Sequence, residues 1–112
     1  MEDSNIEYLK IHLNEFYGLR NNRNPTGELD VCALYKNYML IFEFKTFDAF
    51  ELRKKAYLQL QRATDYFLKP LEERMLSSEM DFLSPKKIYT FYTYWDENAN
   101  IQIESIRSFY HY

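Results

Sequence analysis

The sequence predicts one α/β domain, residues 1–112, with a mixed central β-sheet flanked by α-helices. A chain of 112 residues is long enough for one hydrophobic core and too short for two. Hydrophobic residues make up 46% of the chain and charged residues 28%, which is typical of a folded domain. The spacing of apolar residues changes along the chain between three to four, as in helices, and two, as in strands.

Residues 4–18 are predicted to form a helix. Ser4 is a suitable N-cap, and Glu7 completes a capping box three residues later. Apolar residues then recur at steps of three and four: Ile6, Leu9, Leu13 and Phe16. The polar stretch 19–26 is predicted to be a short edge strand that ends in a turn at Pro25-Thr26-Gly27.

A β-hairpin is predicted for residues 28–35 and 38–46. Both segments are rich in residues of the set Val, Ile, Leu, Tyr and Phe, and Lys36-Asn37 between them has the length of a tight turn. With these two residues in the turn, the numbers of directly opposite residues sum to 73.

This register places acidic side chains opposite one another. Asp30 faces Glu43, and Glu28 faces Lys45, with all four on one face at the end away from the turn. The same face is apolar nearer the turn, so we expect the acidic pair to border the core. Like charges directly opposite in a sheet are destabilising, and partial burial increases the cost.

Two further helices are predicted after the hairpin. Residues 47–68 carry apolar residues at steps of three and four, and Pro70 ends the pattern. Residues 71–83 form a weaker amphipathic pattern, bounded by Ser84-Pro85. Strands are predicted at 87–95 and 101–109, joined by a turn at 96–100.

A divalent cation would compensate the acidic pair. Mg²⁺ is commonly held by one or two carboxylates together with water and phosphate oxygens, and Asp30 with Glu43 supplies that number. Lys45, on the same face, could align or deprotonate an attacking water. The alternative is that these charges form a solvated ladder on a sheet edge. The apolar run 39–42, which leads directly into Glu43, favours the cation because it marks a buried strand.

At these residues the sequence resembles the PD-(D/E)XK nuclease superfamily, and it is most similar to the small Holliday-junction-resolvase-like branch. The resemblance covers about residues 2–68. It is carried by Gly27-Glu28-Leu29-Asp30, followed after twelve residues by Glu43-Phe44-Lys45 on an apolar strand. It implies a restriction-endonuclease-like core in α-β-β-β-α-β order, with a C-terminal hairpin added. The implied activity is a Mg²⁺-dependent endonuclease on DNA, with Mn²⁺ as a substitute for Mg²⁺.

The resemblance also implies roles for particular residues. Asp30 and Glu43 would be metal ligands together with the main-chain carbonyl of Phe44, and Lys45 would be the catalytic lysine. The glutamate that the family carries on its first helix corresponds to Glu7 or to Glu2. Small relatives generally pair, so a homodimer is expected.

The long helix carries a polar stripe beside its apolar one. Lys55, Gln59, Arg62 and Tyr66 follow one another at steps of four, three and four. Gln59 is the best candidate for the active site, because it lies closest to the apolar stripe. Lys55 and Arg62 are candidates for DNA contacts, as are Arg20 and Arg23.

The charge distribution agrees with a local DNA site. Residues 20–62 contain eight basic and five acidic residues, a net charge of +3, whereas the whole chain carries −3. The negative total excludes a basic coat protein but allows a local basic surface.

Other classes of site are not supported. Cys32 is the single cysteine, and two histidines without ligand spacing make a zinc site improbable. The two glycines cannot form a phosphate-binding loop, and no organic cofactor or membrane association is expected. We expect a cytoplasmic protein. The competing hypothesis is a non-catalytic nuclease-fold module that binds nucleic acid or a protein through its aromatic C-terminal hairpin.

Overall fold

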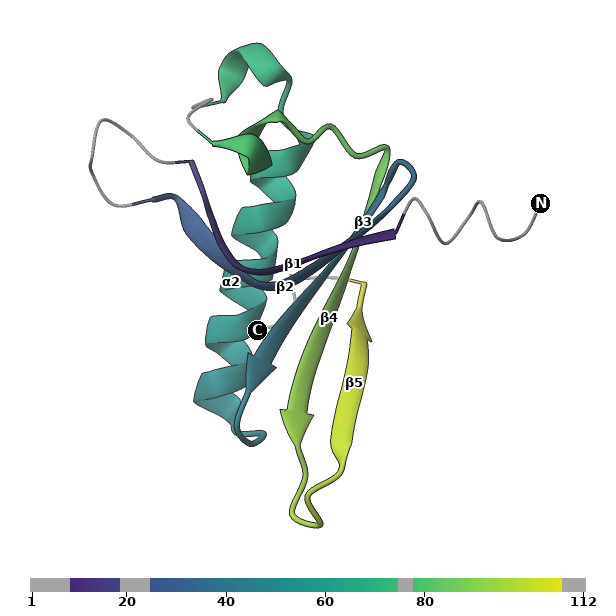
Figure 1. The fold of residues 1–112 in the computed structure, drawn as a ribbon. Coiled ribbons are helices and arrows are strands. Elements are labelled where there is room, and N and C mark those ends of the chain that lie inside the picture. Colours follow the sequence, from purple (N-terminus) through teal and green to yellow (C-terminus); the bar gives the residue numbers. More distant parts are fainter. Residues whose placement is uncertain (1–8, 19–24, 75–77, 108–112) are drawn as a thin grey trace, which may run out of the picture.

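The computed structural model describes residues 9–18, 25–74 and 78–107. They form five strands, one long helix and two short 3₁₀ helices (Figure 1). In chain order the elements are β1 (Leu9–Tyr17), β2 (Gly27–Tyr35), β3 (Tyr38–Lys45), α2 (Phe50–Leu68), η1 (Leu71–Glu73), η2 (Glu79–Phe82), β4 (Lys87–Trp95) and β5 (Ile101–Ile106).

The strands form one mixed sheet in the order β1-β2-β3-β4-β5. β3 and β4 are parallel, and all other neighbouring strands are antiparallel. Parallel strands need a crossover connection, and here α2 and the two short helices provide it. The predicted α/β class is therefore confirmed at this level.

The predicted hairpin is confirmed with its turn and its register. β2 and β3 are joined at Lys36-Asn37, where Lys36 adopts a left-handed conformation with φ of 55°. Val31 lies opposite Phe42 and Cys32 opposite Ile41, so the numbers of paired residues sum to 73 as expected. The long helix and the strand 87–95 are also confirmed, although α2 begins at Phe50 rather than at residue 47.

The helix predicted for residues 4–18 is wrong over the described residues 9–17, which form β1. Leu9, Ile11 and Leu13 also fit a period of two, and hydrogen bonding to β2 decides in favour of the strand. Residues 4–8 of the predicted helix, with Glu7, lie outside the described residues, as does most of the predicted edge strand 19–26.

The continuous helix predicted for residues 71–83 is also wrong. The described residues form only η1 and η2, because contacts with other elements hold this segment. Arg74 donates hydrogen bonds to the carbonyls of Phe67, Lys69, Asp81 and Leu83. Asp81, fully buried, accepts from the main chain of Gly18 at 2.8 Å and from the Tyr66 hydroxyl at 2.6 Å. These hydrogen bonds satisfy buried polar groups. A regular helix would place the same groups where they lack these partners.

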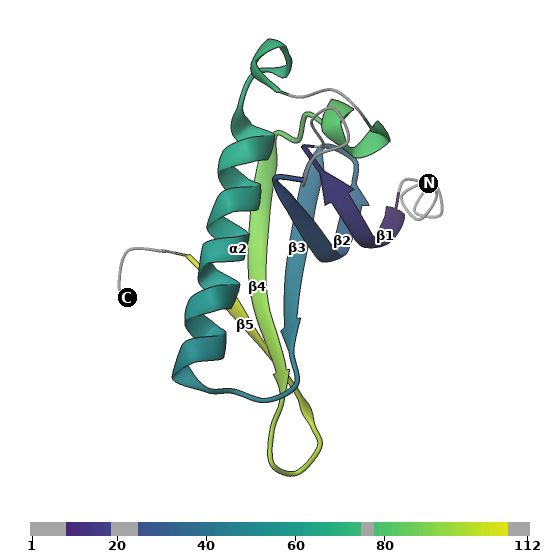
Figure 2. The ribbon, with the colours of Figure 1, turned by 90° about the vertical axis from the view of Figure 1, so that its left-hand side faces the viewer.

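The core lies on one face of the sheet, between the strands and α2 (Figure 2). Met39 and Ile41 of β3 and Tyr92 of β4 are all at most 1% exposed, and they pack with a row of small and large side chains on α2. That row is Ala56, Leu60, Ala63, Tyr66 and Phe67. The apolar residues whose spacing predicted the helix are thus the ones that α2 buries against the sheet.

β1 and β2 bend together toward α2, as Figure 2 shows. The regular pairing of β1 with β2 is interrupted at Asn14 and Asp30. Asn14 adopts a left-handed conformation there, with φ of 53°. Beyond the bend, Tyr17 and Leu29 enter the core, and the Tyr17 ring packs at 5.0 Å from that of Tyr66.

Candidate functional site

The acidic pair lies where β2 begins to bend away from β3. The ladder between these strands ends at Val31 opposite Phe42, one step before Asp30 and Glu43. The Asp30 carboxylate instead accepts a hydrogen bond of 3.0 Å from the main-chain N–H of Phe44. Glu28, two residues before Asp30, is exposed and lies opposite Phe16 of β1. The β2–β3 ladder ends before it reaches Glu28 and Lys45, which were expected to face each other.

Glu43 is a buried carboxyl group, only 4% exposed. It continues the core-facing row of Met39 and Ile41, because alternate residues of a strand share a face. Burial and, to a lesser extent, the charge of Asp30 raise the pKa of Glu43 from its ordinary 4.5 to about 8, with Lys45 acting in the opposite direction. Close to neutral pH, the Glu43 carboxyl group therefore largely keeps its proton.

Lys45 and Gln59 complete this group from two different elements. The Lys45 ammonium lies 3.5 Å from Glu43 Oε2 and donates a hydrogen bond of 3.2 Å to Gln59 Oε1. Lys45 ends β3 and Gln59 lies in the middle of α2, so this bond ties the strand to the helix that crosses it. Four predicted site residues, Asp30, Glu43, Lys45 and Gln59, are thus brought together.

Tyr17 is a neighbour of the site that sequence reasoning did not identify. Its side chain is 1% exposed, and burial raises the pKa of its hydroxyl to about 12, while Arg62 lowers it and Glu43 raises it. The phenol also lies over Gly27, where an added Cβ would come within 2.4 Å of Tyr17 Oη. The glycine that opens the Gly-Glu-Leu-Asp motif is therefore needed to make room for this ring. No signal in the sequence indicates the contact, because it depends on the bend in β1.

The predicted DNA-contacting residues fall into two groups. Lys55 and Arg62 are exposed on α2, and Arg62 borders a hollow of about 350 Å³ together with Thr26 and Lys69. Arg20 and Arg23 lie outside the described residues. The fourth member of the polar stripe on α2 is not a surface group, since it is Tyr66, bonded to Asp81 in the core.

The basic surface inferred from segment charge is smaller than expected, because Arg53 is neutralised. Its guanidinium contacts Glu104 at 2.6 and 2.9 Å and Asp48 at 3.2 and 2.8 Å. It also lies 4.6 Å from the ring of Tyr92. This arrangement fastens the start of α2 to β5 and leaves little of the Arg53 charge for a phosphate.

The donors at the acidic pair fit a divalent cation that keeps several waters. Within residues 9–18, 25–74 and 78–107, no group of three or more Asp, Glu, His or Cys side chains is arranged to hold a metal. Mg²⁺ needs fewer, since one or two carboxylates are its usual protein ligands. Asp30 and Glu43 supply these, and the N–H bond to Asp30 places the main chain of Phe44 beside them.

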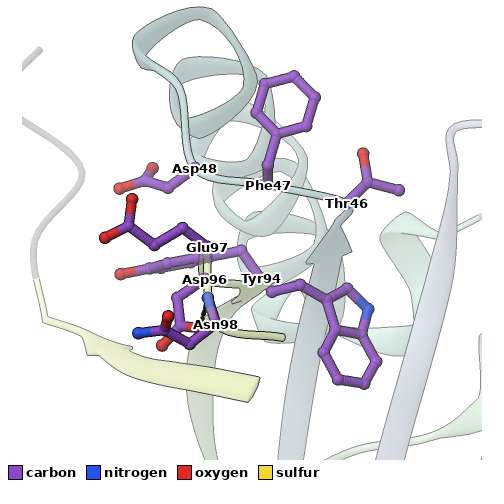
Figure 3. A pocket seen from close by; sticks show the side chains of 8 residues that line it. Thr46, Phe47, Asp48, Tyr94, Asp96, Glu97 and Asn98 are labelled. Carbon is purple, nitrogen blue, oxygen red and sulfur yellow. Dashed lines mark hydrogen bonds between the residues drawn. The ribbon is translucent and has the colours of Figure 1, made fainter. Parts of the chain in front are cut away.

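A second hollow, of about 470 Å³, lies beyond the ends of β3 and β4 (Figure 3). Two of the three acidic side chains that line it have partners: Asp48 binds Arg53, and Asp96 accepts hydrogen bonds from Asn98, Asn100 and Gln102. In Figure 3 the Phe47 ring points away from these carboxylates, whereas Tyr94 lies beside them. Asp48 and Asp96 are thus already hydrogen-bonded within the protein.

Comparisons of the chain with protein-family models, with curated proteins and with solved structures found no match. None of the helices in the described residues combines the length and the apolar composition needed to cross a membrane.

Proposed function

We propose that this protein is a metal-dependent nuclease that hydrolyses phosphodiester bonds in DNA, on a restriction-endonuclease-like core. The observation that carries the proposal is the convergence of Asp30, Glu43, Lys45 and Gln59 at one end of a buried strand. A solvated charge ladder would not bury Glu43, because burying a carboxylate without a compensating partner is costly.

Each of these side chains has a distinct part in the proposed chemistry. Asp30 and Glu43 would hold a Mg²⁺ or Mn²⁺ ion. When bound, the ion supplies positive charge that stabilises the negative charge developing on the phosphate during hydrolysis. Glu43 must release its proton to become a ligand, since metals bind the ionised carboxylate.

Lys45 orients the attacking water in this proposal. An ammonium group has three N–H donors, and the contacts with Glu43 and Gln59 direct two of them. The third remains to bind the water or a phosphate oxygen. Gln59 does not touch the substrate in this scheme, and it acts as a positioning residue that limits the rotation of Lys45.

The placement of the sequence motif supports the same family. Gly27-Glu28-Leu29-Asp30 opens β2, and Glu43-Phe44-Lys45 ends β3, which feeds into the crossover helix α2. The described part of the chain differs from the family order in one respect, because β1 takes the place where a helix was expected.

A cleavage assay with purified protein tests the proposal. Linear, nicked, flapped and four-way-junction DNA are incubated with Mg²⁺ or Mn²⁺, and products are separated by electrophoresis. We expect cleavage of at least one substrate, and Asp30→Asn and Lys45→Ala should each reduce its rate by about 100-fold or more. Lys54→Ala, an exposed lysine on α2 outside the site, is the matched control. Cleavage of none, or equal cleavage by the variants, would refute the proposal.

Calorimetric titration with Mn²⁺ separates the enzyme from the non-catalytic module. Binding heat that disappears in Glu43→Ala would support the assigned ligands. Unaltered heat in that variant would favour a module that keeps the fold and binds its partner elsewhere.

A further inference from the structure

One face of the sheet is apolar and is left uncovered by the described residues. The core, α2 and η2 all lie on the opposite face, and no strand residue of the uncovered face belongs to the core cluster. We call this surface the open face. Its large, well-exposed side chains are Leu9, Ile11, Leu13, Tyr38, Phe44, Tyr89, Trp95, Ile101 and Ile103.

The strand register shows that these side chains form one continuous surface. Leu13 lies opposite Val31, which lies opposite Phe42, which lies beside Phe91, so one apolar row runs from β1 to β4. The rings of Phe42 and Phe91 stack at 4.6 Å. A parallel row passes from Ile11 through β2 and β3 to Tyr89.

The area of the open face is that of a stable interface. Its nine well-exposed side chains are between 39% and 61% exposed. At about 100 Å² each they present roughly 900 Å². A standard protein interface buries about 800 Å² on each partner, whereas the largest apolar patch of a typical monomer measures about 300–600 Å².

The charge of the open face argues against nucleic acid as its occupant. Outside the bent ends of β1 and β2 (residues 14–17 and 27–30), Lys87 is the one charged residue that the register places on this face, and it stands at the first position of β4. Binding to DNA depends on several cationic contacts with phosphates. An uncharged apolar surface is instead complementary to itself, as a two-fold symmetric interface requires.

We propose that the open face is the interface of a homodimer, in which the sheets of two copies pack against each other. Facing sheets pack about 10 Å apart with their side chains interdigitated. The expectation of a dimer came from a resemblance, but this interface is argued from the open face alone. α2 and the acidic pair then lie on the outer side of each copy, where a substrate can reach them.

Two measurements test the proposal on the full chain. Sedimentation equilibrium should give twice the mass of the chain at about 100 μM, far above a micromolar dissociation constant. Trp95, the single tryptophan, is 47% exposed on the open face. Its emission should therefore move to shorter wavelength as protein concentration rises and water is excluded from the interface.

Substitutions on opposite edges of the open face locate the interface. Leu13→Lys and Ile103→Lys should each raise the dissociation constant by about tenfold or more, because two lysines would be buried per dimer. Leu58→Lys on α2 is the control, since Leu58 is 53% exposed but on the other side of the molecule, and it should leave the constant unchanged. Circular dichroism establishes that each variant is folded.

Other outcomes would overturn the proposal. If the wild type is a monomer that binds the dye ANS, the open face is exposed and its partner is a different protein. If it is a monomer that does not bind ANS, residues of the same chain cover the open face. A dimer that only Leu58→Lys disrupts would place the interface on the helix.

Discussion

Replacing Glu43 by glutamine is expected to remove much of the pH dependence of stability above pH 4.5. The substitution keeps the shape of the side chain and deletes its ionisation. Glu43 is 4% exposed, so its ionised form is desolvated in the folded protein and solvated in the unfolded chain. Ionisation of Glu43 above pH 4.5 therefore favours the unfolded chain and lowers the free energy of unfolding of the wild type.

The size of the effect follows from the pKa values. Burial, the charge of Asp30 and a weaker opposing effect of Lys45 place the pKa of folded Glu43 at about 8, against an ordinary value of 4.5. Below pH 4.5 the group is protonated in both states, and its contribution to stability is fully present. As pH rises to about 8 that contribution is lost. At about 1.4 kcal/mol for each pKa unit, the loss approaches roughly 4–5 kcal/mol.

Urea denaturation followed by circular dichroism measures this loss. Wild type and Glu43→Gln are compared at pH 5, 6.5 and 8.5, in EDTA and at one protein concentration, since association also affects stability. The stability of the variant relative to wild type should rise by several kcal/mol across the series. Asp30→Asn should show a smaller rise, because it removes a charge that raises the pKa of Glu43.

Glu51→Gln is the control for this measurement, since it makes the same change at an exposed glutamate in the first turn of α2, away from the buried site. A constant difference between Glu43→Gln and wild type at all three pH values would refute the assignment of Glu43 as a buried, protonated carboxyl group.

Three further substitutions test contacts around the site. Gly27→Ala should lower the free energy of unfolding by about 1–3 kcal/mol, because its Cβ would press on the Tyr17 phenol, and urea denaturation measures the loss. Arg53→Lys should cost about 1–2 kcal/mol through loss of its paired bonds to Glu104, and a double-mutant cycle with Glu104→Gln should show coupling between the two residues. Asp81→Asn should lower stability by about 2 kcal/mol, because an amide cannot accept all the hydrogen bonds of the buried carboxylate, and a wild-type melting curve in this variant would contradict that role.

Local signals predicted the centre of the molecule well. The two-residue turn at Lys36-Asn37 determines the register of β2 against β3, and the register determines that Asp30 and Glu43 come together. The spacing of apolar residues gave α2 and placed Gln59 next to its buried stripe. The proximity of Lys45 to Gln59 follows, because β3 leads directly into the helix that packs on it.

Contacts between distant segments were not predictable in the same way. A capping box and a helical spacing favoured a helix at residues 4–18, but pairing with β2 holds residues 9–17 as a strand. The segment around Arg74 is held by carbonyl groups of its surroundings rather than by its own periodicity. Tyr17 approaches the site only because β1 bends at Asn14.

The parallel pairing of β3 with β4 has a consequence for the order of folding. The β2–β3 hairpin and α2 are close in sequence, so their contacts close short loops, whereas Tyr38 of β3 pairs with Lys87 of β4 across the whole crossover. The docking of β4 is therefore expected to be a late step. It brings the Thr93 hydroxyl onto the Glu43 carbonyl at 2.9 Å and completes the burial of that strand end. Glu43 should take up a proton in this step. The rate of folding near pH 8 should therefore depend on pH more steeply than the rate of hairpin formation does.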